Sequence, residues 1–257
     1  MKPVKIAAWM LAMTMFLCTN CSVFATGGTF LDVAAGHWAY AAVERAFSDK
    51  AVEGSYYNPG TGERRFEPER DVTVAEFVAV LTRSFFPEEL KTTQAGLAFP
   101  STPWYDPYIR AGRDAGLFEN AEQLADAPDK ALIRYDMAVL LGNLFCRFSD
   151  TVPSQLDPAL DPPKAEEIVA DWSVIPEPYR DAVLLTVRSG LLQGVDEKGI
   201  FDGESTLTRA QMVTIYCRVA DWLHSMGKPE APTEPVSPDP ADPIPVPVPI
   251  EPPVVTE

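Results

Sequence analysis

The stretch STLTRAQMVTIYC, residues 205–217, places a cation where the electrostatics of a helix disfavour one. Thr208 and Gln211 stand three residues apart ahead of an apolar run, which is the spacing of a capping box at a helix start. Arg209 then falls in the first turn, at the positive end of the helix dipole. Because the unpaired backbone N–H groups of a helix start also attract negative charge, this pattern predicts an anion-binding site.

The choice of arginine narrows the chemistry of the anion. A guanidinium can hold a planar carboxylate with two parallel hydrogen bonds, and an ammonium group cannot. The alternative is that Arg209 forms an ion pair with an acidic residue of another part of the fold, such as Asp32 or Asp171. The sequence leaves both interpretations open.

Three matching segments share this pattern, at residues 72–83, 132–143 and 207–218. Their apolar columns recur at spacings of one, three and four residues, which predicts one buried helical face in each. A second helical pattern precedes each of them, at residues 38–47, 104–113 and 178–187. One such unit cannot bury a sufficient core alone. We therefore expect three units to pack around a shared axis in an all-α fold.

A short turn follows the first helix of each unit. Gly116 and Gly190 stand where a helix commonly ends in a left-handed residue. A second position of the same turn holds Gly54, Asn120 and Gly194 in the three units. Asparagine tolerates positive φ better than most non-glycine residues, so we expect a left-handed backbone at all three positions.

The composition argues against several classes of function. Residues 1–25 contain two lysines and no acid, so their removal lowers the formal charge from −16 to −18. Nucleic acid requires a basic face, and we expect none here. Cys146 and Cys217 lie in apolar helical runs, which indicates buried free thiols. With two histidines and no catalytic or phosphate-binding motif, we expect no enzyme, cofactor or metal site.

The two ends of the chain differ from its middle. An apolar stretch after two lysines, followed by Val23-Phe24-Ala25, predicts a secretory signal peptide over residues 1–25. We expect no membrane span in the mature chain, because no later segment is apolar enough. Residues 227–257 contain 11 of the 25 prolines, which predicts a disordered, extended tail that acts as a spacer or recruits a partner.

The three units resemble the repeats of the S-layer homology (SLH) domain family. Such a repeat runs F-x-D, a tryptophan, a helix, G-I-x-x-G, F-x-P and then T-R-A-E at a second helix. The first copy reads FLDVAAGHW, AVEG, FEP and TVAE, the second FPSTPW, GLFEN and IRYD, and the third VADWSVIPEPY, GLLQG, FDG and TRAQ. The resemblance divides the chain into SLH repeats at residues 29–90, 96–148 and 166–226.

This resemblance implies a pseudo-threefold arrangement in which one helix of each repeat builds a central bundle. It also implies a secreted bacterial protein, held non-covalently at the cell wall or S-layer through secondary cell-wall polysaccharide. That polymer typically carries pyruvyl ketals and binds in grooves between repeats. In such domains the arginine of T-R-A-E contacts the acidic sugar, which implies Arg209 and Arg134 here. The further groove residues are Trp38, Trp104, Thr208, Gly54, Asn120, Gly194, Asp32 and Asp171.

The copies depart from the family pattern in places that matter for binding. Val74 stands where the first copy needs its arginine, and Ile133 replaces a capping threonine, which costs that helix roughly 1 kcal/mol. Trp38 and Trp104 have two open roles, stacking on sugar or packing in the core. We expect one or two competent grooves. The alternative function is a degenerate module that binds other surface-layer proteins without binding sugar.

Overall fold

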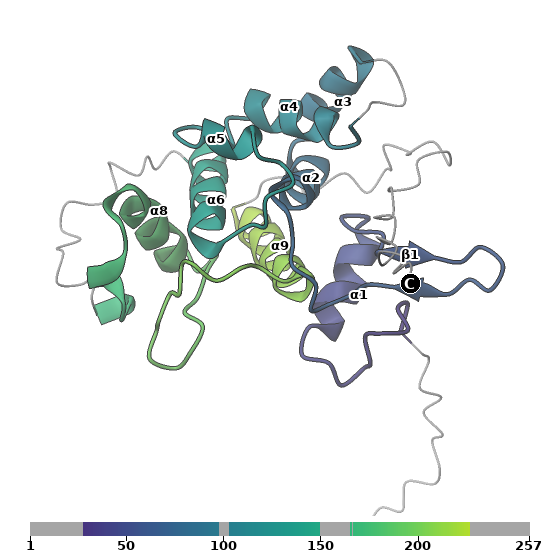
Figure 1. Cartoon of the computed structure of the whole chain (residues 1–257), viewed down its shortest axis with the longest axis horizontal. Helices are drawn as coiled ribbons and strands as arrows, with labels where there is room; N and C mark the ends of the chain where they lie inside the picture. Colours follow the sequence, from purple (N-terminus) through teal and green to yellow (C-terminus); the bar gives the residue numbers. More distant parts are fainter. Residues whose placement is uncertain (1–27, 98–102, 150–164, 166, 227–257) are drawn as a thin grey trace, which may run out of the picture.

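The computed structural model describes residues 28–97, 103–149, 165 and 167–226, and over these residues the protein is mostly helical, as the sequence predicts (Figure 1). The helices are α1 (Tyr40–Ser48), α2 (Val74–Phe85), α3 (Pro87–Ala95), α4 (Asp106–Asp114), α5 (Glu122–Ala125), α6 (Arg134–Phe148), the 3-10 helix η2 (Trp172–Val174), α8 (Glu177–Arg188) and α9 (Arg209–Ser225). The predicted signal peptide and proline-rich tail lie outside the described residues. Within the described part, no helix is long and apolar enough to cross a bilayer.

A small hairpin interrupts the first unit. Strands β1 (Tyr56–Tyr57) and β2 (Arg64–Arg65) pair antiparallel, with Tyr56 opposite Arg65 and Tyr57 opposite Arg64. Figure 1 shows this hairpin projecting from the side of the helical body. The guanidinium of Arg64 lies between the rings of Tyr57 and Phe47, which fastens the hairpin to α1.

The second helix of each unit begins as the sequence predicts. Thr73 with Glu76 and Thr208 with Gln211 form complete capping boxes at the starts of α2 and α9. At the start of α6, Ile133 has no side-chain oxygen and makes no cap. All three helix starts are also held by backbone hydrogen bonds to a neighbouring unit.

Three backbone hydrogen bonds close a ring just before these helix starts. The Val72 N–H donates to the carbonyl of Leu207 at 2.8 Å, Leu132 N–H donates to Val72 at 2.8 Å, and Leu207 N–H donates to Leu132 at 2.9 Å. Each segment thus donates to one unit and accepts from the other. Because the ring needs all three segments, no unit can complete it alone.

The residues after the ring repeat the same cycle. The first helical N–H groups of α2, α6 and α9 donate to carbonyls of the next unit, in the pairs Val74 to Lys130, Arg134 to Ser205, and Arg209 to Arg70. The following N–H groups do likewise, in the pairs Ala75 to Pro128, Tyr135 to Gly203, and Ala210 to Pro68. These bonds satisfy backbone donors that a helix start leaves without an intrahelical partner.

Helix packing follows the same order. The first helix of each unit packs on the second helix of another unit, with α1 on α9, α4 on α2, and α8 on α6. Figure 1 shows α2, α6 and α9 in the middle of the molecule. Their apolar residues, such as Phe77, Met137 and Val213, are fully buried in one continuous core. The predicted apolar columns are therefore core positions.

The predicted left-handed turns are present at four positions and absent at a fifth. Gly116 (φ +78°) and Gly190 (φ +75°) are left-handed, as are Gly54 (φ +97°) and Asn120 (φ +58°). The prediction for Gly194 is wrong, because its φ lies outside this range. A Cβ there would lie 2.7 Å from the Cα of Gly199, so close chain approach, rather than positive φ, explains this glycine.

Candidate functional site

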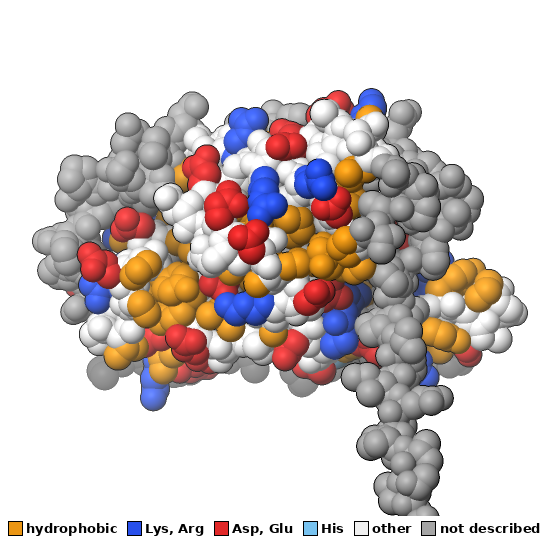
Figure 2. Space-filling view, turned by 45° about the horizontal axis from the view of Figure 1, so that its top comes forward, with side chains coloured by type: hydrophobic (Ala, Val, Ile, Leu, Met, Phe, Trp, Pro, Cys, Tyr) orange, Lys and Arg blue, Asp and Glu red, His pale blue; other side chains and the backbone are white. Residues whose placement is uncertain are grey.

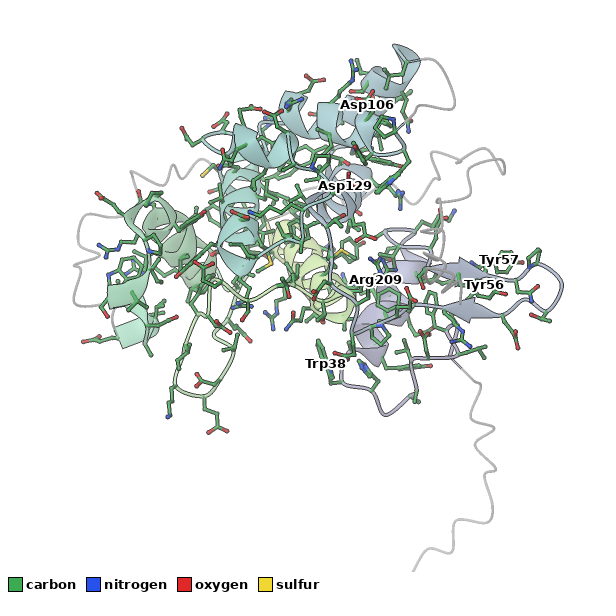
Figure 3. All side chains as sticks on the ribbon, in the orientation of Figure 1. Trp38, Tyr56, Tyr57, Asp106, Asp129 and Arg209 are labelled. Carbon is green, nitrogen blue, oxygen red and sulfur yellow. The ribbon has the colours of Figure 1, made fainter. Side chains whose placement is uncertain are left out.

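Arg209 lies at the start of α9, where the third unit meets the first (Figure 3). Only 7% of its surface is exposed. Its Nε donates a 2.7 Å hydrogen bond to the carbonyl oxygen of Phe66, and its guanidinium carbon lies 4.6 Å from the centre of that phenyl ring. We call this contact between the start of α9 and the turn at Phe66 the Arg209 seam.

Asp32 shapes the same turn from the other side. Its two carboxylate oxygens accept hydrogen bonds from the N–H groups of Phe66 and Glu67, both at 2.8 Å. Glu67 has a φ of +58°, which is costly for a residue with a Cβ. The two bonds to Asp32 stabilise this conformation and present the Phe66 carbonyl to Arg209.

Arg209 pairs with an acid that the sequence analysis did not name. Nη1 of Arg209 lies 3.8 Å from a carboxylate oxygen of Glu76 at the start of α2. Among the described residues, Glu76 is the acid that forms an ion pair with Arg209. Asp32 uses both oxygens on backbone N–H groups. An acid of another unit does contact the arginine, so the second interpretation of Arg209 holds in part, with Glu76 in the place of Asp32.

Arg134 repeats this geometry where the second unit meets the third, a contact we call the Arg134 seam. Its Nε donates to the carbonyl of Phe201 at 2.7 Å, and the guanidinium lies over that ring at 4.8 Å. Asp171 accepts from the N–H groups of Phe201 and Asp202 at 2.7 and 3.0 Å. In both seams, therefore, an aspartate binds the N–H of a phenylalanine and an arginine binds the carbonyl of the same phenylalanine.

The two seams differ in how many guanidinium nitrogens have a hydrogen-bond acceptor. Nη2 of Arg134 donates to the carbonyl of Gln193 at 2.9 Å. Nη2 of Arg209 has no hydrogen bond in the described part of the chain and is not fully buried. The two seams also differ in the neighbouring turn, since Gly54 has a φ of +97° and Gly194 does not have a positive φ. Among the described residues, Arg209 keeps both Nη atoms free of hydrogen bonds, whereas Arg134 keeps only Nη1 free.

Aromatic rings further occupy the Arg134 seam. Tyr135 stacks on Tyr179 at 4.7 Å and on Phe201 at 5.9 Å. Burial raises the pKa of Tyr135, and nearby acids, Asp171 first, raise it further. The other two units have alanine at this position, Ala75 and Ala210. A tyrosine in the third place of the T-R-A-E pattern was the sequence signal for this filled seam, and the sequence analysis missed it.

The third contact, between the first and second units, has no arginine. Val74 is fully buried there, and its N–H donates to the backbone carbonyl of Lys130. We call this contact the Val74 seam, and the predicted groove residues of the second unit are Trp104 and Asn120. Trp104 is half-buried and its ring packs beside Tyr105 and Tyr108. The predicted residues of this groove thus lack the cation that the chemistry requires.

Trp38 is the most exposed of the predicted aromatic residues in the described chain. It lies just before α1 with 62% of its surface exposed, so it is not a core residue (Figure 3). Its ring stacks on His37 at 5.7 Å. His37 in turn accepts the Ala39 N–H and lies 3.4 Å from Glu69, which fixes its ring at the helix start.

The backbone part of the predicted anion site is absent. The first three N–H groups of α9 donate to Arg70, to Pro68 and to the Thr208 hydroxyl. The expectation that they would be free for an anion is therefore wrong, because neighbouring chain already satisfies them. Any anion at this helix start must be held by the Arg209 side chain.

Burial and the neighbouring acids act in opposite directions on the pKa of Arg209. Burial lowers the pKa of Arg209 to about 10, the carboxylate of Glu76 opposes this shift, and the charge of Arg70 adds to it. Burial likewise lowers the pKa of Arg134. A buried cation that is incompletely compensated is stabilised by a ligand carboxylate.

No protein-family model matches this chain, and no curated protein matches it. Among the described residues, no group of three or more histidine, cysteine, aspartate and glutamate side chains is arranged to hold a metal ion. Figure 2 shows acidic and basic side chains interspersed on one face of the molecule. The Arg209 seam is the described site whose chemistry is most specific.

Proposed function

We propose that this protein binds an anionic polysaccharide of the bacterial cell wall through the Arg209 seam and is held there non-covalently. The observation that carries the proposal is the free Nη edge of a buried arginine whose Nε is already fixed on Phe66. A fixed, desolvated guanidinium is suited to a carboxylate, because little side-chain entropy remains to be lost on binding. A pyruvyl ketal supplies such a carboxylate.

We also propose that the three units are SLH repeats around a pseudo-threefold axis. The ring of Val72, Leu132 and Leu207 supports this, because one hydrogen-bond pattern recurs in all three units. The order of helix packing supports it as well, since each first helix packs on the second helix of another unit. In this arrangement α2, α6 and α9 form the central bundle.

The seams support one main site. Arg209 has two Nη atoms without a hydrogen bond in the described chain, Arg134 has one because two carbonyls bind its Nε and Nη2, and Val74 offers no cation. Trp38 belongs to the first unit, as Phe66 does, and its exposed ring supplies a face on which a sugar can stack. We assign the carboxylate to Arg209 and the sugar ring to Trp38.

The rest of the chain fits a non-catalytic surface protein. Residues 1–25 direct secretion, and the proline-rich residues 227–257 act as a spacer. The alternative is a protein-interaction module. The Val74 seam favours it, because that seam is sealed by an apolar residue and retains no sugar-binding cation.

Calorimetry with two hexosides tests the proposal. The mature protein should bind a methyl hexoside that carries a pyruvyl ketal and should bind the same hexoside without the ketal much more weakly. In parallel, washed bacterial walls should retain the protein until a chaotrope is added, and should lose it after mild acid removes the ketals. Equal binding of the two hexosides, or retention by ketal-free walls, would falsify the carboxylate assignment and favour the protein-interaction module.

A further inference from the structure

We infer that Glu76 is a built-in competitor that sets the affinity of the Arg209 seam for its carboxylate ligand. This inference rests on the proposed function, because it concerns the same arginine. Glu76 places its own carboxylate oxygen 3.8 Å from Nη1 of Arg209. A ligand carboxylate that approaches the free edge of Arg209 therefore meets a like charge beside the same guanidinium.

The other acids near this arginine are engaged elsewhere. Asp32 accepts two backbone N–H groups, one at each oxygen. Glu67 lies 3.4 Å from Nε of Arg70. Among the described residues, Glu76 is the acid within ion-pair distance of Arg209, so competition for the guanidinium falls to it.

Glu76 is itself shared between two cations and a helix cap. Arg70 binds both of its carboxylate oxygens, and the Thr73 N–H donates to one of them at 3.0 Å. Arg70 thereby draws Glu76 toward the start of α2 and leaves Arg209 at the longer distance of 3.8 Å. The position of the Glu76 carboxylate between Arg70 and Arg209 therefore sets how strongly Arg209 attracts the carboxylate of a ligand.

The Arg134 seam has a glutamine, Gln211, at the position equivalent to Glu76. The N–H of Arg209 binds the Arg70 carbonyl, six residues before Glu76. In the equivalent place the N–H of Arg134 binds the Ser205 carbonyl, six residues before Gln211. Gln211 closes the capping box with Thr208 as Glu76 does with Thr73. A glutamine therefore preserves the cap and removes only the charge.

The test is the variant Glu76→Gln in the full mature protein, titrated with the pyruvyl-ketal hexoside and with its methyl ester. Affinity for the acid should rise about three- to tenfold, the effect of removing one partly screened like charge. Affinity for the neutral ester should not change. The variant Glu63→Gln removes an exposed acid from the β1–β2 hairpin of the same unit and should bind like the parent.

A double-mutant cycle locates the effect. In the background Arg209→Ala, the variant Glu76→Gln should give no gain for the acid. Arg70→Met, which frees Glu76 from its nearer cation without touching the capping box, should weaken binding about threefold or more. Circular dichroism checks that each variant keeps its helix content.

The outcomes separate this inference from the proposed function. If Glu76→Gln leaves affinity for the acid unchanged while Arg209→Ala still loses binding, Glu76 is only a helix cap and the inference fails. If the gain persists in the Arg209→Ala background, Glu76 acts on some other group and the inference also fails. If Arg209→Ala binds the acid as the parent does, the site does not lie at the Arg209 seam, and the assignment of binding to that seam fails together with the inference.

Discussion

Arg209 and Phe66 are 143 residues apart in the sequence, and Nε of the one lies 2.7 Å from the carbonyl oxygen of the other. The same bond joins Arg134 to Phe201 at the same distance. A pair of interactions this alike is built by the fold and is independent of any ligand. The two arginines differ at their Nη atoms, because Nη2 of Arg134 donates to Gln193 and the Nη atoms of Arg209 have no hydrogen bond in the described chain. This difference leads to opposite expectations for their variants.

Arg209→Ala should reduce affinity for the pyruvyl-ketal hexoside about ten- to hundredfold, because a charge-assisted contact contributes roughly 1.5–3 kcal/mol. Arg209→Lys should recover only part of this affinity, since an ammonium cannot form two parallel hydrogen bonds. Calorimetry measures both. Arg65→Ala, in the exposed strand β2, is the control and should bind like the parent. Unchanged binding by folded Arg209→Ala would move the site elsewhere.

Arg134→Ala should act mainly on stability. The carbonyl groups of Phe201 and Gln193 both lose their donor, and buried unsatisfied groups cost about 1–3 kcal/mol each. Thermal unfolding should therefore occur at a clearly lower temperature, while affinity for the hexoside measured below that temperature changes less than about threefold. A large loss of affinity without a loss of stability would show that Arg134 binds ligand as well.

Gly203→Ala should destabilise the protein severely, because a Cβ at this position would overlap the ring of Tyr135. Overpacking of this kind costs about 1–3 kcal/mol or more. The second substitution Tyr135→Ala, which restores the residue type found at Ala75 and Ala210, should recover much of the stability. Denaturant unfolding of the two single variants and the double variant measures the coupling, and strict additivity would contradict it.

Cys146 and Cys217 are free thiols, but both are half-buried where the sequence predicts buried ones. The thiol of Cys217 should still react slowly in the folded protein. Burial raises its pKa from 9.0 to about 11, an effect that Arg45 opposes and Asp221 and Asp49 strengthen. Since the thiolate is the nucleophile, alkylation at pH 8 should be about a hundredfold slower than for a free cysteine. Its rate should rise as the pH approaches 11 or when denaturant is added. Mass spectrometry of iodoacetamide adducts checks this, and rapid labelling at pH 8 would contradict the burial.

The described part of the chain should unfold in a single transition. Leu132→Pro removes one donor of the ring that joins Val72, Leu132 and Leu207, and it should lower the unfolding temperature of all three units together. Circular dichroism at 222 nm and tryptophan fluorescence should report the same midpoint. Two separate transitions would mean that one unit is stable without the ring.

The sequence by itself determined the local structure of this protein. The capping pairs at Thr73 and Thr208 act over three residues, so the starts of α2 and α9 were readable from spacing alone. The left-handed Gly116 and Gly190 were readable for the same reason. Helix α3 was not predicted, although Pro87 at its first position followed by two glutamates is a helix-start signal.

Only the tertiary structure decided what these elements do to one another. The N–H groups at the start of α9 were expected to be free, and carbonyls of Arg70 and Pro68 bind two of them. Gly194 was expected to have positive φ, and its close approach to Gly199 explains it instead. Arg209 donates to the Phe66 carbonyl and pairs with Glu76, whereas Asp32 accepts backbone N–H groups. The contacts of Arg209 and of the α9 N–H groups join residues far apart in sequence and depend on the cyclic closure of three units, which local spacing does not encode. The approach of Gly194 to Gly199 lies within one loop, but it depends on the folded path of that loop.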